Sequence, residues 1–409
     1  MLFDVIIAVI LFAVLYVNVF HILLWVDERK ALRKRGGAKT LPRLSVIIPA
    51  HNEEKTIVDA VKHVLQSNYP KNKLEVIVVD DGSTDATYRV LSEWRRKEKL
   101  GARVRIFRKP RGGKASALNY GMRFAKGEII AVMDADSLLS KNALRNCVSY
   151  FDDERVAAVT SHILPKGNSI LERLQKLEFM VISFTRKLQE GLNLIFATPG
   201  PLSLYRSDVL KSLGGFDEKN LTEDIEICWR IIRAGYKVRM AYDARVYSLY
   251  PSDLKTWIKQ RTRWNMGGVQ TVRKYLPSFF DKRRHPIKTW QLPLFLVSAV
   301  LTIVGLIAFT YLWISFLVKQ TLYVIETLRL GGNPFRFFFS VNVDVLAVLG
   351  ISTFVTTLIF VKIVLDEYKK GFTRADVCLF LTVYILLFPW VFAYALYKII
   401  AGKYGWLTK

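Results

Sequence analysis

Four long apolar stretches constrain what this chain of 409 residues can fold into. One lies at the start and three lie near the other end, at Leu2–Val26, Trp290–Val318, Val343–Leu365 and Val377–Tyr397. A transmembrane helix needs about 20 mainly apolar residues, and helices buried in a globular core are usually shorter. The pattern therefore predicts one membrane helix, a polar middle domain and about three further membrane helices, although residues 319–340 leave the number of late helices open.

The expected units are a membrane helix over residues 1–28, the polar domain over 44–250, a segment of interfacial helices over 251–288 and the late membrane helices over 289–400. A cleaved signal peptide would begin with a basic segment. The chain instead begins with Met1-Leu2-Phe3-Asp4, which favours an uncleaved helix.

The charge distribution indicates an orientation and a class of partner. Sixty Lys and Arg residues against 35 Asp and Glu give a net charge of +25. Basic residues gather at 29–43 and 273–288, next to the membrane helices that flank the domain, and such flanks mark the cytoplasmic side. We therefore expect an integral protein of the cell membrane with a cytoplasmic domain. Anionic membrane lipids are the expected partners of this charge; no nucleic acid is expected, because no basic helix or base-stacking module stands out.

The middle domain alternates apolar β-like runs with helical periodicity. The strands are expected at Leu44–Ala50, Leu74–Asp80, Val104–Phe107 and Ile129–Asp134. The helices between them are expected at Glu53–Ser67, after the turn Gly82–Asp85 to about Arg96, and at Lys114–Ala125. This alternation predicts an α/β domain with a mostly parallel sheet. Ligands bind such sheets beyond the carboxyl ends of the strands.

Acidic residues stand at two of those strand ends. Asp80 and Asp81 close the second strand, and Asp134 and Asp136 close the fourth. Two carboxylates on one tight turn suit Mg²⁺ or Mn²⁺ that also binds phosphates, although a solvated turn would show the same residues. The basic loop that ends at Lys114 opens a helix and suits a diphosphate. Neither a GxxxxGK[ST] loop nor a GxGxxG after the first strand is present.

Asp224 follows Thr222 and Glu223 at the expected start of a helix over residues 225–234. From its position alone it is either a helix cap or a general base for a hydroxyl group.

Taken in order, six motifs resemble the family 2 glycosyltransferases, which have the Rossmann-like GT-A fold. They are Ser45–Glu54, Val79–Asp85, Gly113–Asn119, Asp134–Asp136, Thr222–Asp224 and Gln260–Trp264. The last two match the TED and QxxRW motifs of the processive, membrane-embedded branch, which includes cellulose, chitin, hyaluronan and poly-N-acetylglucosamine synthases.

The resemblance implies a role for each matching residue. Ala50 and Glu53 would line the nucleotide pocket, and Asp80 or Asp81 would contact the uracil. Lys114 would touch the diphosphate, Asp134 would lie beside the nucleotide, Asp136 would ligate the metal and Asp224 would be the general base. Gln260, Arg263 and Trp264 would hold the diphosphate and shape the acceptor site.

The implied reaction moves a sugar from a nucleotide sugar, expected to be a UDP-sugar, to a growing polysaccharide at the membrane, with possible coupling to its translocation. One base and no second nucleophile predict inversion at the anomeric carbon. The alternative is transfer of a single sugar to a membrane lipid. Two amphipathic segments, around Ile170–Leu188 and Leu254–Ile258, are expected to lie in the membrane interface or to pack on the domain.

Overall fold

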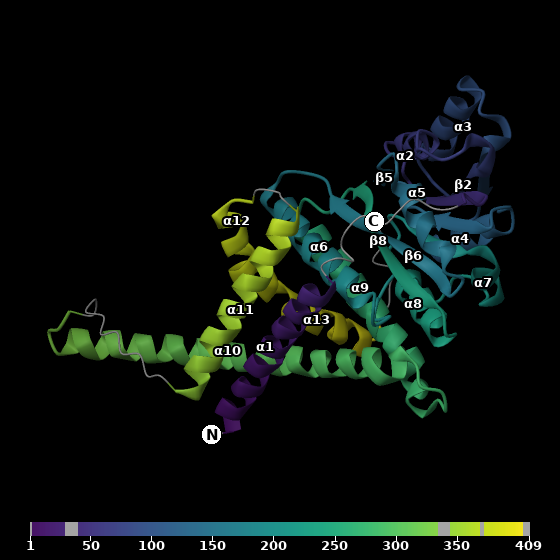
Figure 1. The fold of residues 1–409 in the computed structure, drawn as a ribbon. Coiled ribbons are helices and arrows are strands. Elements are labelled where there is room, and N and C mark those ends of the chain that lie inside the picture. Colours follow the sequence, from purple (N-terminus) through teal and green to yellow (C-terminus); the bar gives the residue numbers. More distant parts are fainter. Residues whose placement is uncertain (1, 29–39, 334–343, 369–371, 404–409) are drawn as a thin grey trace.

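The structure is a computed structural model that describes residues 2–28, 40–333, 344–368 and 372–403. The basic residues 29–39, on which much of the expected orientation depends, lie outside these ranges. The described chain forms an α/β domain joined to a group of long helices (Figure 1).

An eight-stranded sheet forms the centre of the domain, in the order β3-β2-β1-β4-β7-β6-β8-β5. Its strands are β1 (Leu44–Ala50), β2 (Leu74–Asp81), β3 (Val104–Lys109), β4 (Ile129–Val132), β5 (Leu138–Leu139), β6 (Val156–Pro165), β7 (Ser203–Arg206) and β8 (Lys237–Ser248). The first four strands pair in parallel, as do β6 and β8, whereas β7 runs antiparallel to both β4 and β6, and β5 runs antiparallel to β8. The expected GT-A-like, mostly parallel sheet is confirmed, with an antiparallel strand inserted at its middle.

Helices cover both faces of this sheet. They are α2 (Ile57–Leu65), α3 (Thr87–Lys97), α4 (Lys114–Met122), α5 (Ala143–Val148), α7 (Ser207–Ser212) and α8 (Glu223–Arg233), with short 3-10 turns at Lys71–Lys73, Gly101–Arg103 and Ser149–Asp152. Successive residues of a strand point to opposite faces. Val46 and Ile48 accordingly enter the core under α2 and α5, while Ile47 enters the core under α4 and α8.

Several expected element ends differ from the structure by a few residues, and two of these differences shape the loops at the strand ends. The first domain helix begins at Ile57 rather than Glu53, because Asn52 takes a positive φ of 57° and its side chain accepts the Thr84 N–H at 2.9 Å. The fourth strand stops at Val132, because the Asp134 N–H donates to the Gly200 carbonyl instead of a neighbouring strand. The acidic turn is thus held against the Gly200 loop.

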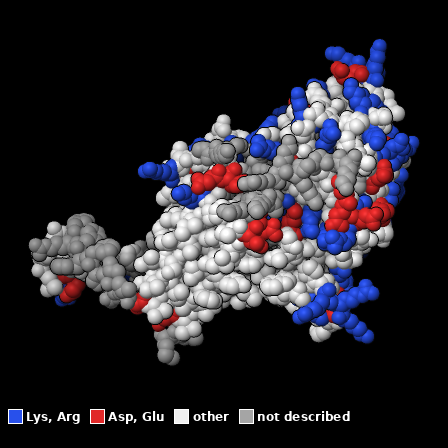
Figure 2. Space-filling view, in the orientation of Figure 1, with Lys and Arg blue, Asp and Glu red and all other residues white. Residues whose placement is uncertain are grey.

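Four helices are long and apolar enough to cross a membrane within the described ranges. The first is α1 (Leu2–Glu28), the second is the π-helical turn η5 (Ile287–Gln291) continued by α10 (Leu292–Arg329), the third is α11 (Val345–Tyr368), and the fourth joins α12 (Arg374–Leu379), the π-helical turn η6 (Phe380–Tyr384) and α13 (Ile385–Ile400). Figure 2 shows a broad uncharged surface over this part of the molecule and charged residues gathered on the sheet domain.

Two amphipathic helices, α6 (Ile170–Gln189) and α9 (Leu254–Tyr275), join the sheet domain to the membrane helices, and a 3-10 turn (Leu276–Phe280) follows α9. The apolar stripes of both helices pack against other parts of the protein. Phe184 and Leu188 of α6 lie in one cluster with Phe360 of α11. Leu174 and Leu177 lie in another with Trp257 of α9 and with Phe380 and Tyr384 of η6. The two helices therefore fix the sheet domain to the membrane helices.

Candidate active site

A cavity of about 470 Å³ lies where the sheet, α6, α9 and α10 meet. Seven residues singled out in the sequence line it: Lys114, Asp134, Asp136, Asp224, Gln260, Arg263 and Trp264. They come from distant parts of the chain, from Lys114 to Trp264. The structure therefore brings the acidic turn, the TED motif and the QxxRW motif to one space, with Asp136 and Asp224 in the same cavity.

Lys114 occupies the sheet side of this cavity as the first residue of α4. Its Nζ lies 2.6 Å from Asp134 Oδ1 and 3.2 Å from Glu223 Oε1. Burial alone would lower the pKa of this ammonium, but Asp134, Glu223 and Asp224 outweigh burial and raise the pKa above its ordinary value. Lys114 is therefore a fixed positive charge at the opening of a helix, where an anion is favoured.

Gly200 packs directly against this ion pair. A Cβ at this position would lie 2.1 Å from Lys114 Nζ and 2.7 Å from Asp134 Oδ1. Because Gly200 has no side chain, the Lys114–Asp134 ion pair fits beside it.

Asp224 lies in the first turn of α8, one residue after Glu223. The residue before the helix is Thr222, so Asp224 is not the N-cap; its Oδ1 accepts the Ile225 N–H at 3.0 Å. Burial and the neighbouring Glu223 raise the pKa of Asp224 to about 6, against the opposing effect of Lys114 and Arg263. A carboxylate with such a pKa is ionised at neutral pH and is still able to take up a proton.

Asp136 is the residue expected to ligate a metal ion. It is half-buried in the cavity, and Ser248 donates a hydrogen bond to its Oδ1 at 3.3 Å. No cluster of three or more His, Cys, Asp or Glu side chains suited to a metal occurs in the described parts of the chain. Mg²⁺ on a nucleotide diphosphate needs only one or two protein carboxylates, because phosphates and water supply its other ligands. The single carboxylate of Asp136 fits that arrangement.

The QxxRW motif lies on α9, on the other side of the cavity. Arg263 Nη1 donates to the Leu221 carbonyl at 3.2 Å, and Gly267 lies so close to Thr222 that a Cβ there would meet the Thr222 Cβ at 2.8 Å. The α9 helix is thereby held against the TED loop. Trp264 is half-buried, with its ring beneath the guanidinium of Arg261 at 4.2 Å.

Arg261 belongs to a buried network that the sequence did not indicate. Its Nη2 donates to Glu178 Oε2 at 2.6 Å, and the Tyr384 hydroxyl donates to the same oxygen at 2.5 Å. Trp257 Nε1 in turn donates to the Tyr384 oxygen at 2.9 Å. Since Tyr384 ends the π-helical turn η6, the network connects the last membrane helix to the tryptophan of the cavity.

The remaining predicted residues, Ala50, Glu53, Asp80 and Asp81, do not line this cavity. Asp80 pairs with Arg108 at 3.0 Å. Asp81 accepts the N–H groups of Gly112 and Gly113 and the ammonium of Lys109 at 2.7–2.9 Å. In the structure Asp81 therefore shapes the loop that leads to Lys114, and its expected contact with uracil stays a prediction.

This chain is similar in sequence to known proteins, and three of these relatives are described here. It is 35% identical over 269 residues to the probable glycosyltransferase YdaM of Bacillus subtilis (64% of this chain, 63% of the relative). It is 29% identical over 262 residues to a beta-monoglucosyldiacylglycerol synthase of Nostoc sp. (63% and 56%) and 28% identical over 257 residues to a poly-beta-1,6-N-acetyl-D-glucosamine synthase of Staphylococcus epidermidis (62% and 60%). The chain thus spans less than two thirds of the length of these curated relatives.

The likeness to a solved structure extends over nearly the whole chain. The mannosyltransferase PcManGT from Pyrobaculum calidifontis, solved in complex with GDP-Man and Mn²⁺, aligns over 97% of this chain and 99% of its own, with a TM-score of 0.58 and 20% identity. At that identity the likeness shows the fold. The profile described as "Glycosyl transferase family 2" matches residues 45–214. The domain that contains these residues therefore has the GT-A fold of glycosyltransferases.

Proposed function

We propose that the protein is an inverting glycosyltransferase that moves a sugar from a nucleotide sugar, in particular a UDP-sugar, to an acceptor at the membrane. The observation that carries the proposal is the shared cavity of Lys114, Asp136 and Asp224 beside the helices long enough to span a bilayer. The named relatives, which include a glycolipid synthase and a polysaccharide synthase, support it.

In the proposed reaction the acceptor oxygen attacks the anomeric carbon while the bond from that carbon to the diphosphate breaks. The bonding electrons leave with the nucleoside diphosphate, and the acceptor proton passes to the Asp224 carboxylate. Lys114 and Arg263 stabilise the negative charge that grows on the leaving group. A divalent metal held by Asp136, Mg²⁺ or Mn²⁺, would add positive charge to the diphosphate. One displacement inverts the configuration of the sugar.

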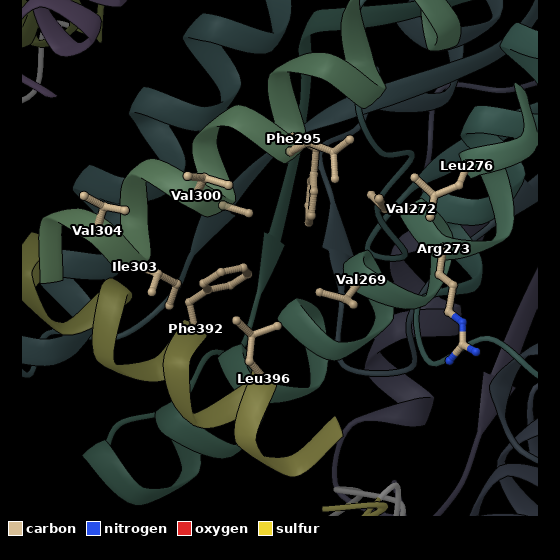
Figure 3. A pocket seen from close by; sticks show the side chains of 12 residues that line it. Val269, Val272, Arg273, Leu276, Phe295, Val300, Ile303, Val304, Phe392 and Leu396 are labelled. Atoms are coloured by element: carbon tan, nitrogen blue, oxygen red, sulfur yellow. The ribbon is translucent and has the colours of Figure 1, made fainter. Parts of the chain in front are cut away.

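An apolar groove beside the cavity favours a lipid acceptor. Phe295 and Asn265 line both the cavity and a hollow of about 380 Å³ between α10 and α13. A second hollow of about 490 Å³ lies across Phe295, Ala299 and Phe392 (Figure 3). Figure 3 shows apolar side chains of α10 and α13 facing one another there, while the Arg273 guanidinium points away. Hydrocarbon chains suit such a lining better than sugars, which need polar partners.

A growing polysaccharide is the second candidate acceptor, and Trp264 favours it. The half-buried indole ring lies in the cavity, and aromatic rings offer sugars an apolar face with a polar edge. The basic residues that flank the membrane helices support a cytoplasmic position for the domain, where nucleotide sugars would reach it.

The test is to supply the full chain, in lipid nanodiscs, with a panel of UDP-sugars and either Mg²⁺ or Mn²⁺, and to follow nucleotide release and product length. Short lipid-linked products would support the lipid acceptor, whereas long chains would support polymerisation. Ala299→Phe, which fills the groove, should reduce transfer to lipid, whereas Val297→Phe, on the exposed side of the same helix, should not. Absence of nucleotide release with every sugar would contradict the proposed function.

A further inference from the structure

Arg186 differs from the other two cations that line the cavity, Lys114 and Arg263. Lys114 is paired with two carboxylates, and Arg263 donates to a backbone carbonyl. Arg186 of α6 lines the same cavity, is half-buried, and forms neither a hydrogen bond nor an ion pair with any residue in the described ranges.

The effect of burial on the arginines is consistent with this difference. Burial lowers the pKa of Arg186 below its ordinary value. Burial acts in the same direction on Arg261, but its partner Glu178 raises the pKa of that guanidinium. A half-buried guanidinium has given up part of its hydration without gaining a partner, and an anion that binds to it recovers the lost interaction.

Arg186 also lies on a particular side of the cavity. Lys114 begins α4, and Asp134 and Asp136 follow β4, whereas α6 packs both on the sheet strands β6 and β8 and on the membrane helices α1, α11 and α12. Three other residues of the same helix line the cavity beside Arg186, namely Ile182, Thr185 and Gln189. Phe295 lines both the cavity and the apolar groove. The unpaired charge therefore lies on a helix that also contacts the membrane helices, where a membrane acceptor would enter, and not on the elements that carry Lys114 and the acidic turn.

The position of Arg186 in its helix offers a simpler explanation for a positive charge at this place. Arg186 is in the last turn of α6, where a cation interacts favourably with the helix dipole. Lys187, in the same turn, also has that advantage, yet it is paired with Glu190 at 2.9 Å and bonded to the Met240 carbonyl. The helix dipole thus does not explain why Arg186 points into the cavity without a partner.

We propose that Arg186 binds a phosphate group of the acceptor, so that the acceptor is a lipid whose head carries a hydroxyl nucleophile and a nearby phosphate. The proposal rests on the proposed function and names the acceptor class. The planar guanidinium binds phosphate oxygens with two parallel hydrogen bonds, which a lysine does not reproduce. Asp224 would receive the proton of the hydroxyl, and the lipid chains would enter the groove between α10 and α13.

Sugar transfer to two lipids, one with a phosphate and one without, tests this proposal. Dioleoylphosphatidylglycerol carries hydroxyls and a phosphodiester, and dioleoylglycerol carries a hydroxyl without phosphate. We expect the full chain in nanodiscs to prefer the first, and Arg186→Gln to raise the KM for it about ten-fold or more. The KM for the nucleotide sugar and the turnover with dioleoylglycerol should be unchanged. Arg186→Lys should restore only part of the affinity.

Arg284→Gln is the matched control, since it removes an exposed positive charge in the loop before α10 without touching the cavity. If it raises the KM for the anionic lipid as much as Arg186→Gln does, general attraction to charged lipid explains the effect and the proposal is wrong. A raised KM for the nucleotide sugar in Arg186→Gln would assign Arg186 to the donor phosphates and overturn it. Transfer to soluble oligosaccharide but to neither lipid would overturn it and leave the transferase intact. No nucleotide release with any acceptor would contradict both.

Discussion

The two sides of the cavity are held in place by different means. On the sheet side, Lys114 and Asp134 form an ion pair, and the acidic turn is hydrogen-bonded to the Gly200 loop next to it. On the helix side, Trp264 is held through Arg261, Glu178 and Tyr384, and the last of these belongs to a membrane helix. The sheet side is therefore fixed within the domain, whereas the helix side depends on how α6 and α9 are seated on the membrane helices.

Asp224 lies between the two sides, and its removal should have the largest effect. Asp224→Asn keeps the shape of the side chain but removes the base that accepts the proton. We expect kcat to fall by about 10²- to 10⁴-fold while the nucleotide sugar still binds. Nucleotide release and donor binding by calorimetry measure the two quantities. Undiminished transfer by this variant would show that Asp224 is not the base.

Gly200→Ala tests the sheet side alone. The new Cβ would displace the Lys114 ammonium and the Asp134 carboxylate. We expect kcat/KM to fall by about 10- to 100-fold, because a shift of about 1 Å in a charged group misplaces the diphosphate. Gly350→Ala on α11 is the control, since its Cβ would meet no atom within 4 Å. Equal losses in both variants would argue for a general effect on folding.

The pH dependence follows from the environment of Asp224. Its pKa is raised to about 6, so the carboxyl group is protonated below that pH and unable to accept a proton. Activity should therefore rise about ten-fold per pH unit below 6 and level off above it. The profile of kcat/KM between pH 4.5 and 8 measures this. A flat profile in that range would mean that no group with such a pKa takes part.

The sequence was informative for the sheet side and much less so for the helix side. Strand ends are visible as apolar runs that stop at Asp80 or Asp134, and parallel strands bring their carboxyl ends together. Glu178 and Tyr384, in contrast, lie 206 residues apart and meet only through the packing of α6 on the last membrane helix. A glutamate in an amphipathic helix reads as a solvated residue, so no local pattern distinguishes it. Arg186, outside the apolar stripe of the same helix, reads as a solvated cation for the same reason.

Tyr384→Phe gives the smallest expected effect and separates the two sides most directly. It removes the hydroxyl that donates to Glu178 and accepts from Trp257, but keeps the ring in its cluster. The buried Glu178–Arg261 pair loses one partner, which should lower the free energy of unfolding by about 1–2 kcal/mol. With Arg261 less well held, Trp264 should shift, and the KM for the acceptor should rise a few-fold while the KM for the nucleotide sugar stays constant.

Tyr394→Phe, at an exposed ring of the same helix, should leave both constants unchanged. If Tyr384→Phe instead changes the donor KM, the membrane helix also acts on the sheet side, and the two sides of the cavity form one coupled unit.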